Sequence, residues 1–213
     1  EHLGIYACRI IVPGMSDIYP AEDLLLANNN MGAGFRETFL SLPGSEWEAQ
    51  DYLDLISQMD DEGLDDFTRV RELLGLATGK DNGWSTLRVG ELKAMLALAG
   101  GDTEQALIWT EWTIEFNSSV FSAERANYYR CLQTLLLLAL EEDRTPAEYL
   151  NAFNRMYGSD AVQAASAAIS GEEPFYGLHQ VDLELTAFPA HQSLLAAYEK
   201  LQAAKRQFWS SQS

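Results

Sequence analysis

The stretch that decides the fold is "GDTEQALIWTEWTIEF", residues 101–116, because its pattern returns 41 positions later as "EDRTPAEYLNAFNRMY", residues 142–157. Each copy opens with a polar turn, continues with large apolar residues at helical spacing, and follows a long apolar segment. The matching residues are Trp109, Trp112 and Phe116 in the first copy, and Leu150, Phe153 and Tyr157 in the second. The sequence therefore predicts a mainly α fold of stacked helical hairpins.

The turn of the first copy resembles the turn inside tetratricopeptide repeats, where a small residue lets the second helix pack closely on the first. Ala94, Gly101 and Ala106 match that pattern. Lys93 stands where Leu is usual, and the spacing between the copies exceeds the usual repeat length. We predict hairpins that are tetratricopeptide-like.

Further helices are predicted before this repeat. Ser45 with Glu48 predicts a capping box for a helix that ends at about Met59. Asp65 or Asp66 is predicted to start the next helix. The apolar face of that helix consists of Phe67, Val70, Leu73 and Leu74. A helix introduced by Trp84 or Ser85 is expected to end at Ala99, and a short one spans Phe35 to Leu40.

Two more helices are predicted after the repeat. The first follows Gly158 and carries small residues at i, i+3, i+4 and i+7, so a neighbouring helix can approach it closely. These residues are Ala161, Ala164, Ala165 and Ala168, and Gly171 caps the helix. The last helix carries an apolar stripe, here called the C-terminal stripe, which is expected to cap the stack. It consists of Leu194, Ala197, Leu201, Ala204 and Phe208.

The start of the chain has a different character. Ile5 to Val12 is almost entirely apolar and is stopped by Pro13-Gly14, which is typical of a central β-strand. Pro20 then opens a short helix to Ala27. Later in the chain, only fragments of strand are predicted, around Phe175-Tyr176 and across 181–188. A strand needs a partner for its backbone groups, so this segment is expected to belong to a sheet whose other strands lie elsewhere.

Composition excludes several classes of partner. The 213 residues carry a net charge of −18, and Lys and Arg are not clustered, so nucleic acid and anionic membranes are not expected to bind. The acidic clusters at 60–62, 65–66, 141–143 and 172–173 are interpreted as solvated surface. The longest apolar run, Leu132 to Leu140, is too short to span a bilayer. Only two cysteines occur, without a pairing motif, which fits a cytoplasmic protein.

No catalytic, cofactor-binding or metal-ligating residue is predicted. His2, His179 and His191 lie far apart without a ligand partner at metal-binding spacing, and His191 is interpreted as a surface residue. Cys8 and Cys131 lie in apolar runs and are expected to be buried and inert. Asp61 and Asp65 could pair on a helix, but such coincidences are common in an acidic chain.

Two features of the sequence could form binding sites. "NNNMGAGFRET", residues 28–38, contains Gly-x-Gly, but only Arg36 could contact a phosphate, which favours a turn between helices. Trp109, Trp112 and Phe116 have the spacing of one buried helical face, which favours core packing over a ligand role. Stacked hairpins commonly leave a groove for a protein partner, so interaction is predicted rather than catalysis.

Several long stretches closely resemble the C-terminal portion of bacterial YcaO proteins, in the stand-alone branch linked to β-methylthiolation of a small-subunit ribosomal protein. They include "YACRIIVPGMSDIYPAEDLLLANNN", "ETFLSLPGSEWE", "DDFTRVRELLGLATG", "LKAMLALAGGD", "WTEWTIEFNSSVFSAERANYYRCLQTLLLLAL" and "YLNAFNRMYG". The resemblance implies a longer parent protein that binds ATP and Mg²⁺ in an N-terminal catalytic domain. The nucleotide and metal ligands of the family lie upstream, so none is carried onto a position here.

The resemblance also implies a domain division. Residues 1–44 correspond to the end of the catalytic domain, and 45–213 to a helical, tetratricopeptide-like C-terminal domain. Azoline-forming relatives end in a Pro-rich tail, whereas this chain ends "KRQFWSSQS", so that cyclising activity is not expected. Phe208 and Trp209 are expected to close the last helix instead.

The function expected is that of a non-catalytic interaction and stabilising domain. Its expected partners are its own catalytic domain, a second copy of the chain, and a methylthiotransferase or ribosomal protein. In the alternative, Arg36 or the turn at Asn28 to Asn30 completes an ATP or peptide-substrate site of the parent. An unpaired strand edge recruits another strand, so a homodimer through residues 1–14 is a further hypothesis.

Overall fold

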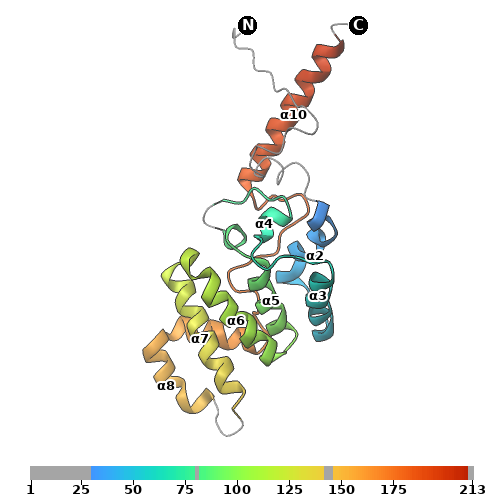
Figure 1. The fold of residues 1–213 in the computed structure, drawn as a ribbon. Helices are drawn as coiled ribbons and strands as arrows, with labels where there is room; N and C mark the ends of the chain where they lie inside the picture. The colour runs from blue at the N-terminus through green and yellow to red at the C-terminus, as the bar shows by residue number, and fades with distance from the viewer. Residues whose placement is uncertain (1–29, 80–81, 142–145, 211–213) are drawn as a thin grey trace.

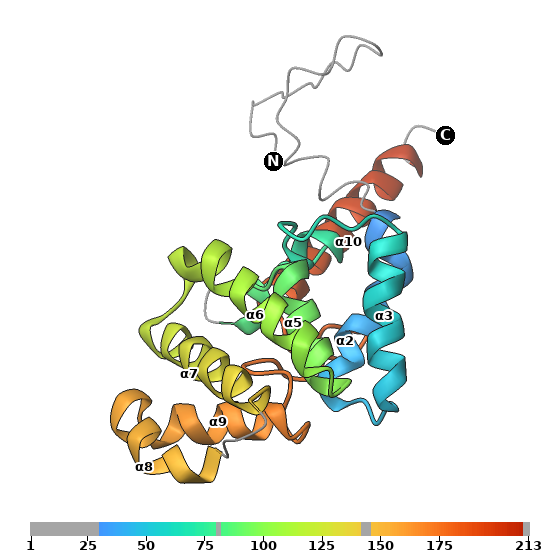
Figure 2. The same ribbon diagram turned by 60° about the horizontal axis from the view of Figure 1, so that its bottom comes forward.

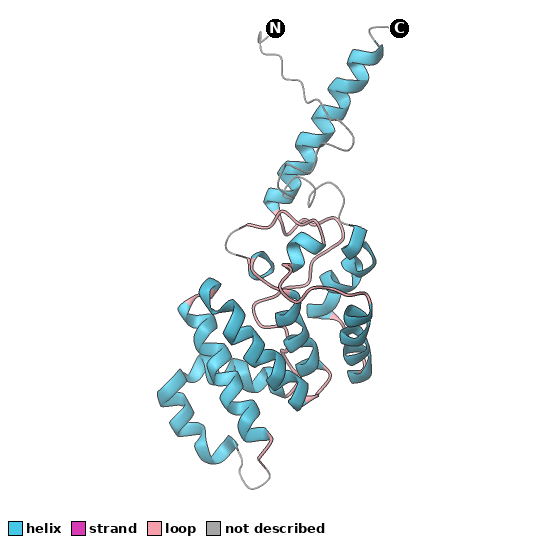
Figure 3. Ribbon diagram, in the orientation of Figure 1, coloured by secondary structure: helices cyan, strands magenta, loops and turns pink. Residues whose placement is uncertain are grey.

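The computed structural model describes residues 30–79, 82–141 and 146–210, which form an assembly of helices and connecting loops (Figure 1). No strand occurs among these residues (Figure 3), and one isolated β-bridge joins Arg69 to Arg88. The mainly α fold class is therefore confirmed.

The α-helices are α2 (Arg36–Ser41), α3 (Ala49–Asp61), α4 (Val70–Leu73), α5 (Val89–Ala99), α6 (Thr103–Asn117), α7 (Ala123–Ala139), α8 (Pro146–Tyr157), α9 (Ser159–Ile169) and α10 (Pro189–Ser210). The 3-10 helices are η1 (Asn30–Phe35), η2 (Leu42–Gly44), η3 (Gly83–Ser85) and η4 (Ser118–Val120).

The segments predicted as β-structure have two outcomes. The strand at Ile5 to Val12 and the short helix from Pro20 lie outside the described residues. The strand fragments around Phe175-Tyr176 and 181–188 are wrong, because this segment forms turns. The Asp182 carboxylate accepts a hydrogen bond from the Thr186 backbone N–H at 2.9 Å, and this local bond bends the chain. Apolar side chains of the segment still enter the core: Phe175, Leu178, Val181, Leu185 and Phe188.

The capping box of α3 lies three residues later than predicted. Glu48 is the N-cap residue, and its backbone N–H donates to the Asp51 carboxylate at 3.1 Å. Ser45 instead donates to the Leu42 carbonyl at 2.8 Å and lies 3.1 Å from the Tyr52 hydroxyl. The pairing of Ser45 with Glu48 is therefore wrong, because Ser45 belongs to the preceding 3-10 turn. The helix itself ends at Asp61, close to its predicted end.

Two predicted helix starts are also wrong. The Asp65 side chain accepts from the Phe67 backbone N–H at 3.1 Å, and this local turn delays the helix, so that α4 begins only at Val70. Likewise, Gly83–Ser85 forms the separate 3-10 helix η3, and α5 begins at Val89. In both places a side chain that accepts a hydrogen bond from the backbone N–H two residues later, Asp65 from Phe67 and Asn82 from Trp84, replaces the expected first helical turn.

The α5 helix is the centre of the body. Every residue from Val89 to Leu98 is buried, including the charged residues Glu91 and Lys93. The helix contacts α3, α6 and α9, and Figure 2 shows it between α3 and α6. An apolar helix that is covered on all sides satisfies its own backbone and can serve as a hub for neighbouring helices.

The predicted helical hairpins are confirmed. The α5 and α6 helices are joined at Gly101, whose φ of +69° suits glycine, and by Asp102, whose carboxylate accepts from the Gln105 backbone N–H at 2.9 Å. The α7 helix packs against α6, α8 and α9. The tetratricopeptide-like detail of these hairpins stays a prediction.

The last two helices contrast with each other. The small-residue face of α9 packs on α7, with Ala165 and Ala168 buried, as predicted. The α10 helix does not cap the stack, so that prediction is wrong. It projects away from the body (Figure 1), and Leu201 is 62% exposed and Phe208 55% exposed. Its first turn is held on the body through the buried His191 and a hydrogen bond from the Gln192 side chain to the Glu184 carbonyl.

The residues just before the predicted domain boundary share the core of the body. Phe39, Leu40 and Leu42 are fully buried and join the same apolar cluster as the side chains of α5. The Val181 backbone N–H donates to the Leu40 carbonyl at 3.1 Å, which ties the loop before α10 to α2. The division at residue 44 stays a prediction.

Candidate functional site

Glu91 and Lys93 of α5 are both charged, and each bonds a different set of neighbouring residues. Glu91 is completely buried and accepts hydrogen bonds from Tyr129 at 2.6 Å, from Asn117 at 3.2 Å and from Arg125. Arg125 also donates to the Thr86 hydroxyl at 2.7 Å. Burial disfavours the charge on Arg125, but the adjacent carboxylate outweighs it and raises the pKa of Arg125. The cluster cross-links α5, α6 and α7.

The tyrosines of this cluster cannot act as bases near neutral pH. Burial, followed by the charge of Glu91, raises the pKa of Tyr129 well above its usual value, and burial also raises the pKa of Tyr128. Both rings are stacked in the core, with Tyr128 lying 3.7 Å from Tyr176 and Tyr129 lying 5.1 Å from Phe121 between ring centroids. The Glu91 cluster is therefore built for stability rather than for proton transfer.

The second cluster surrounds Lys93, the residue that departs from the repeat pattern. Only 1% of its side chain is exposed, and its ammonium lies 2.5 Å from a carboxylate oxygen of Asp60 and 2.6 Å from one of Asp66. The same nitrogen lies 4.6 Å from the centroid of the Trp109 ring, within the range of a cation–π interaction. Lys93 thus ties α3, α5 and α6 together.

This arrangement corrects the interpretation of two acidic clusters. Asp60 and Asp66 are partners of a buried cation rather than plain solvated surface, because the otherwise uncompensated charge of Lys93 requires them. Asp65 bonds the backbone of Phe67 instead of pairing with Asp61. The signal was present in the sequence, since Lys93 is a charged residue inside an apolar helical run.

An aromatic strip lies on the side of α6 that faces the loop before α4. Its ring centroids are 5.2 Å apart between Phe67 and Trp112, 5.1 Å between Phe67 and Phe116, and 5.3 Å between Trp112 and Phe116. Trp109 continues the row at 6.1 Å from Trp112. We use the name aromatic strip for Phe67, Trp109, Trp112 and Phe116.

Trp109, Trp112 and Phe116 were predicted to form a buried core face, and that prediction is wrong, because Phe116 is 39% exposed and both tryptophans are only half-buried. Phe67, predicted on the apolar face of the next helix, is 50% exposed. The face of α6 that is fully buried is smaller and more polar, and consists of Ala106, Thr110, Thr113 and Asn117. Spacing identifies residues that share a face, but the small residues allow closer packing on α5 and α7, so the large rings lie beside that contact.

Contacts with Gly90 on α5 and with Arg88 hold the aromatic strip in place. A Cβ atom at Gly90 would lie 2.6 Å from the Trp112 ring, so only glycine lets the indole rest on α5. Arg88 donates to the Phe116 carbonyl at 3.2 Å, and its guanidinium lies 6.0 Å from the centroid of Phe67. These contacts hold the rings in place while part of their surface stays open.

The residues weighed for a phosphate or metal site have other roles. Arg36 donates to the Leu74 carbonyl at 3.2 Å, and Asn28 and Asn29 lie outside the described residues. His191 is not a surface residue, which corrects the prediction. It is 7% exposed, and its Nδ1 accepts from the Ala77 backbone N–H at 3.2 Å. Burial, and then the charge of Arg36, lowers the pKa of His191.

The remaining histidines and cysteines offer no reactive group among residues 30–79, 82–141 and 146–210. His179 is exposed, and its carbonyl accepts from the Trp84 indole at 3.3 Å. Cys131 is buried, as predicted, and burial raises its pKa to about 11, so it remains a thiol. Cys8 and His2 lie outside this part of the chain. No group of three His, Cys, Asp or Glu side chains in the described part could hold a metal ion.

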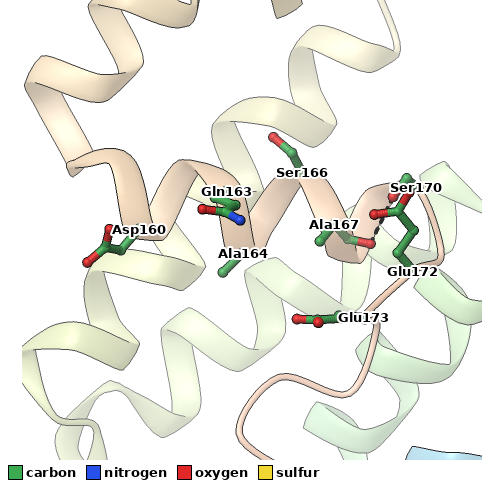
Figure 4. A pocket seen from close by; sticks show the side chains of 8 residues that line it. All are labelled: Asp160, Gln163, Ala164, Ser166, Ala167, Ser170, Glu172 and Glu173. Atoms are coloured by element: carbon green, nitrogen blue, oxygen red, sulfur yellow. Dashed lines mark hydrogen bonds between the residues drawn. The ribbon is translucent and has the colours of Figure 1, made fainter.

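A hollow of about 550 Å³ lies along α9 and the loop that follows it (Figure 4). It is lined by Asp160, Gln163, Ala164, Ser166, Ala167, Ser170, Glu172 and Glu173. The polar side chains among them are exposed, and Ser170 bonds the Ala167 carbonyl at 3.0 Å within its own helix. Exposed carboxylates around an open hollow define no ligand, so the aromatic strip is the stronger candidate site.

No helix in the described part of the chain is both long and apolar enough to cross a membrane.

Comparison with known proteins gives consistent results. The family model described as the YcaO cyclodehydratase C-terminal domain matches residues 32–207. The Escherichia coli (strain K12) protein named "Ribosomal protein S12 methylthiotransferase accessory factor YcaO" is 80% identical over 209 residues. An uncharacterized protein of Haemophilus influenzae is 54% identical over 210 residues. Each alignment covers 98% of this chain but 36% of the relative, so the chain spans about a third of these proteins.

Proposed function

This chain belongs to the YcaO cyclodehydratase C-terminal domain family, and we propose that it is the non-catalytic interaction and stabilising domain of an ATP-dependent YcaO protein. The longer protein is called the parent below. In this proposal, ATP and Mg²⁺ bind in the part of the parent that precedes the domain. In the described residues, Arg36 donates to the Leu74 carbonyl and so has a structural role in this proposal.

The observation that carries the proposal is the exposure of the C-terminal stripe on α10. Leu201 and Phe208 are more than half exposed, although the stripe repeats apolar residues at alternating spacings of three and four, the pattern of a helix that packs on another element. An exposed apolar stripe of this length is a recognised sign of an interaction site.

The proposed occupant of the C-terminal stripe is the rest of the parent. About two thirds of each relative lies outside the aligned region, so a large part of the parent is available to cover α10. The body of helices around α5 carries its own core, so it can act as a rigid base from which α10 reaches the catalytic part. The domain thus fixes the catalytic part in place and stabilises it.

The proposed biological setting follows the name of the Escherichia coli relative. That protein is called an accessory factor of a ribosomal protein S12 methylthiotransferase. We extend this role to the parent of this chain. Its partners are then the methylthiotransferase or the ribosomal protein, with a homodimer as a further possibility and the cytoplasm as the location.

The test uses the whole parent protein with Leu201→Lys in α10. We expect lower thermal stability of the parent and loss of ATP hydrolysis, because a charge in the middle of the C-terminal stripe separates α10 from the catalytic part. Met156→Lys is the matched control, since Met156 is 66% exposed on α8. Unchanged stability and hydrolysis in the Leu201 variant would reject the proposal.

The alternative function, a composite ATP or peptide-substrate site, makes a separate prediction. It requires that Arg36 contacts the substrate, so Arg36→Gln would raise the KM for ATP or peptide more than it lowers stability. A purely structural Arg36, bound to the Leu74 carbonyl, predicts a loss of stability with an unchanged KM.

A further inference from the structure

We propose that the aromatic strip binds a segment of a protein partner that is rich in Arg and Lys. This inference concerns a surface on α6 and the loop before α4, separate from the C-terminal stripe on α10. It therefore goes beyond the attachment role proposed above and can fail independently of it.

The first step is the open surface of the rings. Half of Phe67 and more than a third of Phe116 are exposed, and these rings are in contact with each other and with Trp112. A contiguous row of aromatic rings offers faces with negative potential and edges with positive potential. Such faces attract the cationic groups of Arg and Lys.

The second step is the charge around the strip. Glu115 lies one helical turn from Trp112, and Asp65 lies two residues from Phe67; both carboxylates are exposed. Glu111 does not belong to this group, because its carboxylate accepts a hydrogen bond from Gln133 on α7. The carboxylates complement Arg and Lys by charge-assisted hydrogen bonds while the rings stack on the same side chains. The same carboxylates repel phosphate, which disfavours a nucleic acid as the ligand.

The third step is that the chain already places its own cations on these rings. The Lys93 ammonium lies 4.6 Å from the Trp109 centroid, and the Arg88 guanidinium lies 6.0 Å from the Phe67 centroid. Lys93 is fixed by Asp60 and Asp66, so one cation in this row is held by a ring and by carboxylates together. The partner segment would repeat this combination on the outer side of the strip.

The fourth step is preorganisation. Trp112 rests on Gly90, and Arg88 clamps the end of α6 through the Phe116 carbonyl. Rings that are fixed before binding lose little conformational entropy when a ligand arrives, which raises the affinity that a short segment can reach.

The experiment measures binding of synthetic peptides to the full chain by titration calorimetry. One peptide alternates Arg with Ser, a second alternates Glu with Ser, and a third is rich in uncharged Pro. We expect the Arg peptide to bind, with an affinity that falls as salt rises, and the other two not to bind. Phe67→Ala and Phe116→Ala should each weaken the Arg peptide by about tenfold, and Glu115→Gln by about twofold to threefold.

Matched controls separate the strip from the overall negative charge of the chain. Met156→Ala removes a 66% exposed apolar side chain from α8, and Glu148→Gln removes an exposed carboxylate there. Both should leave binding unchanged, as should Leu201→Lys in α10. Circular dichroism of each variant verifies that the helices are intact.

The proposal is overturned if the Arg peptide does not bind, or if it binds equally to the wild type and to both Phe variants, because overall charge would then explain the attraction. Binding of the Pro-rich peptide, lost in Phe67→Ala, would also overturn it and would assign the strip to uncharged ligands. Binding of the Arg peptide that survives Leu201→Lys would support the strip even if the attachment role of α10 fails.

Discussion

The α5 and α10 helices reverse the usual relation between polarity and burial. The α5 helix buries two charged residues, Glu91 and Lys93, whereas α10 exposes apolar residues such as Leu201 and Phe208. The difference lies in their partners. Charged residues can be buried in α5 because Arg125, Tyr129, Asp60 and Asp66 compensate them. In α10, by contrast, the side chain that is buried on the body is His191 in the first turn, and Leu201 is 62% exposed.

The comparison distinguishes residues that stabilise the fold of this chain from residues that are available for contact with another part of the protein. The clusters on α5 are complete, since each buried charge has its partners within the described residues, so they contribute to the stability of this domain. In the C-terminal stripe on α10, Leu201 is 62% exposed, and the proposed function assigns this side chain to a contact outside the body. Substitutions in α5 should therefore change folding, and substitutions in α10 should change assembly.

The largest effect is expected for Glu91→Ala. The substitution leaves Arg125 as a partly buried charge without its carboxylate, and it removes the acceptor for Tyr129 and Asn117. We expect a loss of about 3–5 kcal/mol in the free energy of unfolding, measured by urea denaturation. Glu91→Gln, which keeps the shape and part of the bonding, should lose less. Wild-type stability in Glu91→Ala would show that the cluster is not a stabilising element.

A smaller loss is expected for Lys93→Ala. The Asp60 side chain is 57% exposed and that of Asp66 is 30% exposed, so both carboxylates can be hydrated after the cation is removed. We expect a loss of about 1–2 kcal/mol, with a change in tryptophan fluorescence because Trp109 loses its cation. Lys93→Met, which keeps the apolar stem, should be close to the wild type in stability. If Lys93→Ala lowered the free energy of unfolding as much as Glu91→Ala, the two clusters would contribute equally to stability.

His191 should make the junction between body and α10 sensitive to pH. Its folded pKa lies below its usual 6.5 because of burial and the nearby Arg36, so the unfolded chain takes up the proton first as the pH falls. The contribution of His191 to stability is therefore present above pH 6.5 and decreases as the pH falls from there through the lowered pKa. Urea midpoints measured between about pH 7.5 and pH 5.5 should show this loss, and His191→Gln should reduce it. An equal pH dependence in both proteins would exclude His191 as its source.

The smallest effect on the chain itself is expected for Leu201→Lys. Leu201 is 62% exposed, so its replacement should change the unfolding free energy of this chain by less than about 0.5 kcal/mol. Thermal unfolding followed by circular dichroism measures this directly. A loss comparable to that of Lys93→Ala would place Leu201 in the core of the isolated domain and would weaken the contrast between the two helices.

Local sequence signals predicted much of the fold. The turn at Gly101 and Asp102 identified the hairpin of α5 and α6, because glycine at positive φ and an N-cap aspartate act through adjacent residues. The small face of α9 was predicted from Ala165 and Ala168 in the same way. The starts of α4 and α5 were predicted too early, because the side chains of Asp65 and Asn82 accept hydrogen bonds from the backbone N–H two residues later and so compete with the first helical turn.

The surfaces were harder to predict, because burial depends on partners that are distant in sequence. The spacing of Trp109, Trp112 and Phe116 correctly groups them on one face, but the packing of Thr110 and Thr113 against neighbouring helices decides that this face stays partly open. His191 was assigned to the surface because its partner, the backbone of Ala77, lies 114 positions away. The expectation of a longer parent protein came from the family resemblance, because patterns of spacing within this chain carry no information about it.

The most direct test of the central claim is hydrogen–deuterium exchange of the α10 amides, compared between this chain alone and the whole parent protein. If α10 attaches the domain to the rest of the parent, the amides around Leu201 exchange quickly in the chain alone and become protected in the parent, while those of α5 are protected in both. Equal exchange of α10 in the two proteins, whether fast or slow, would contradict the account.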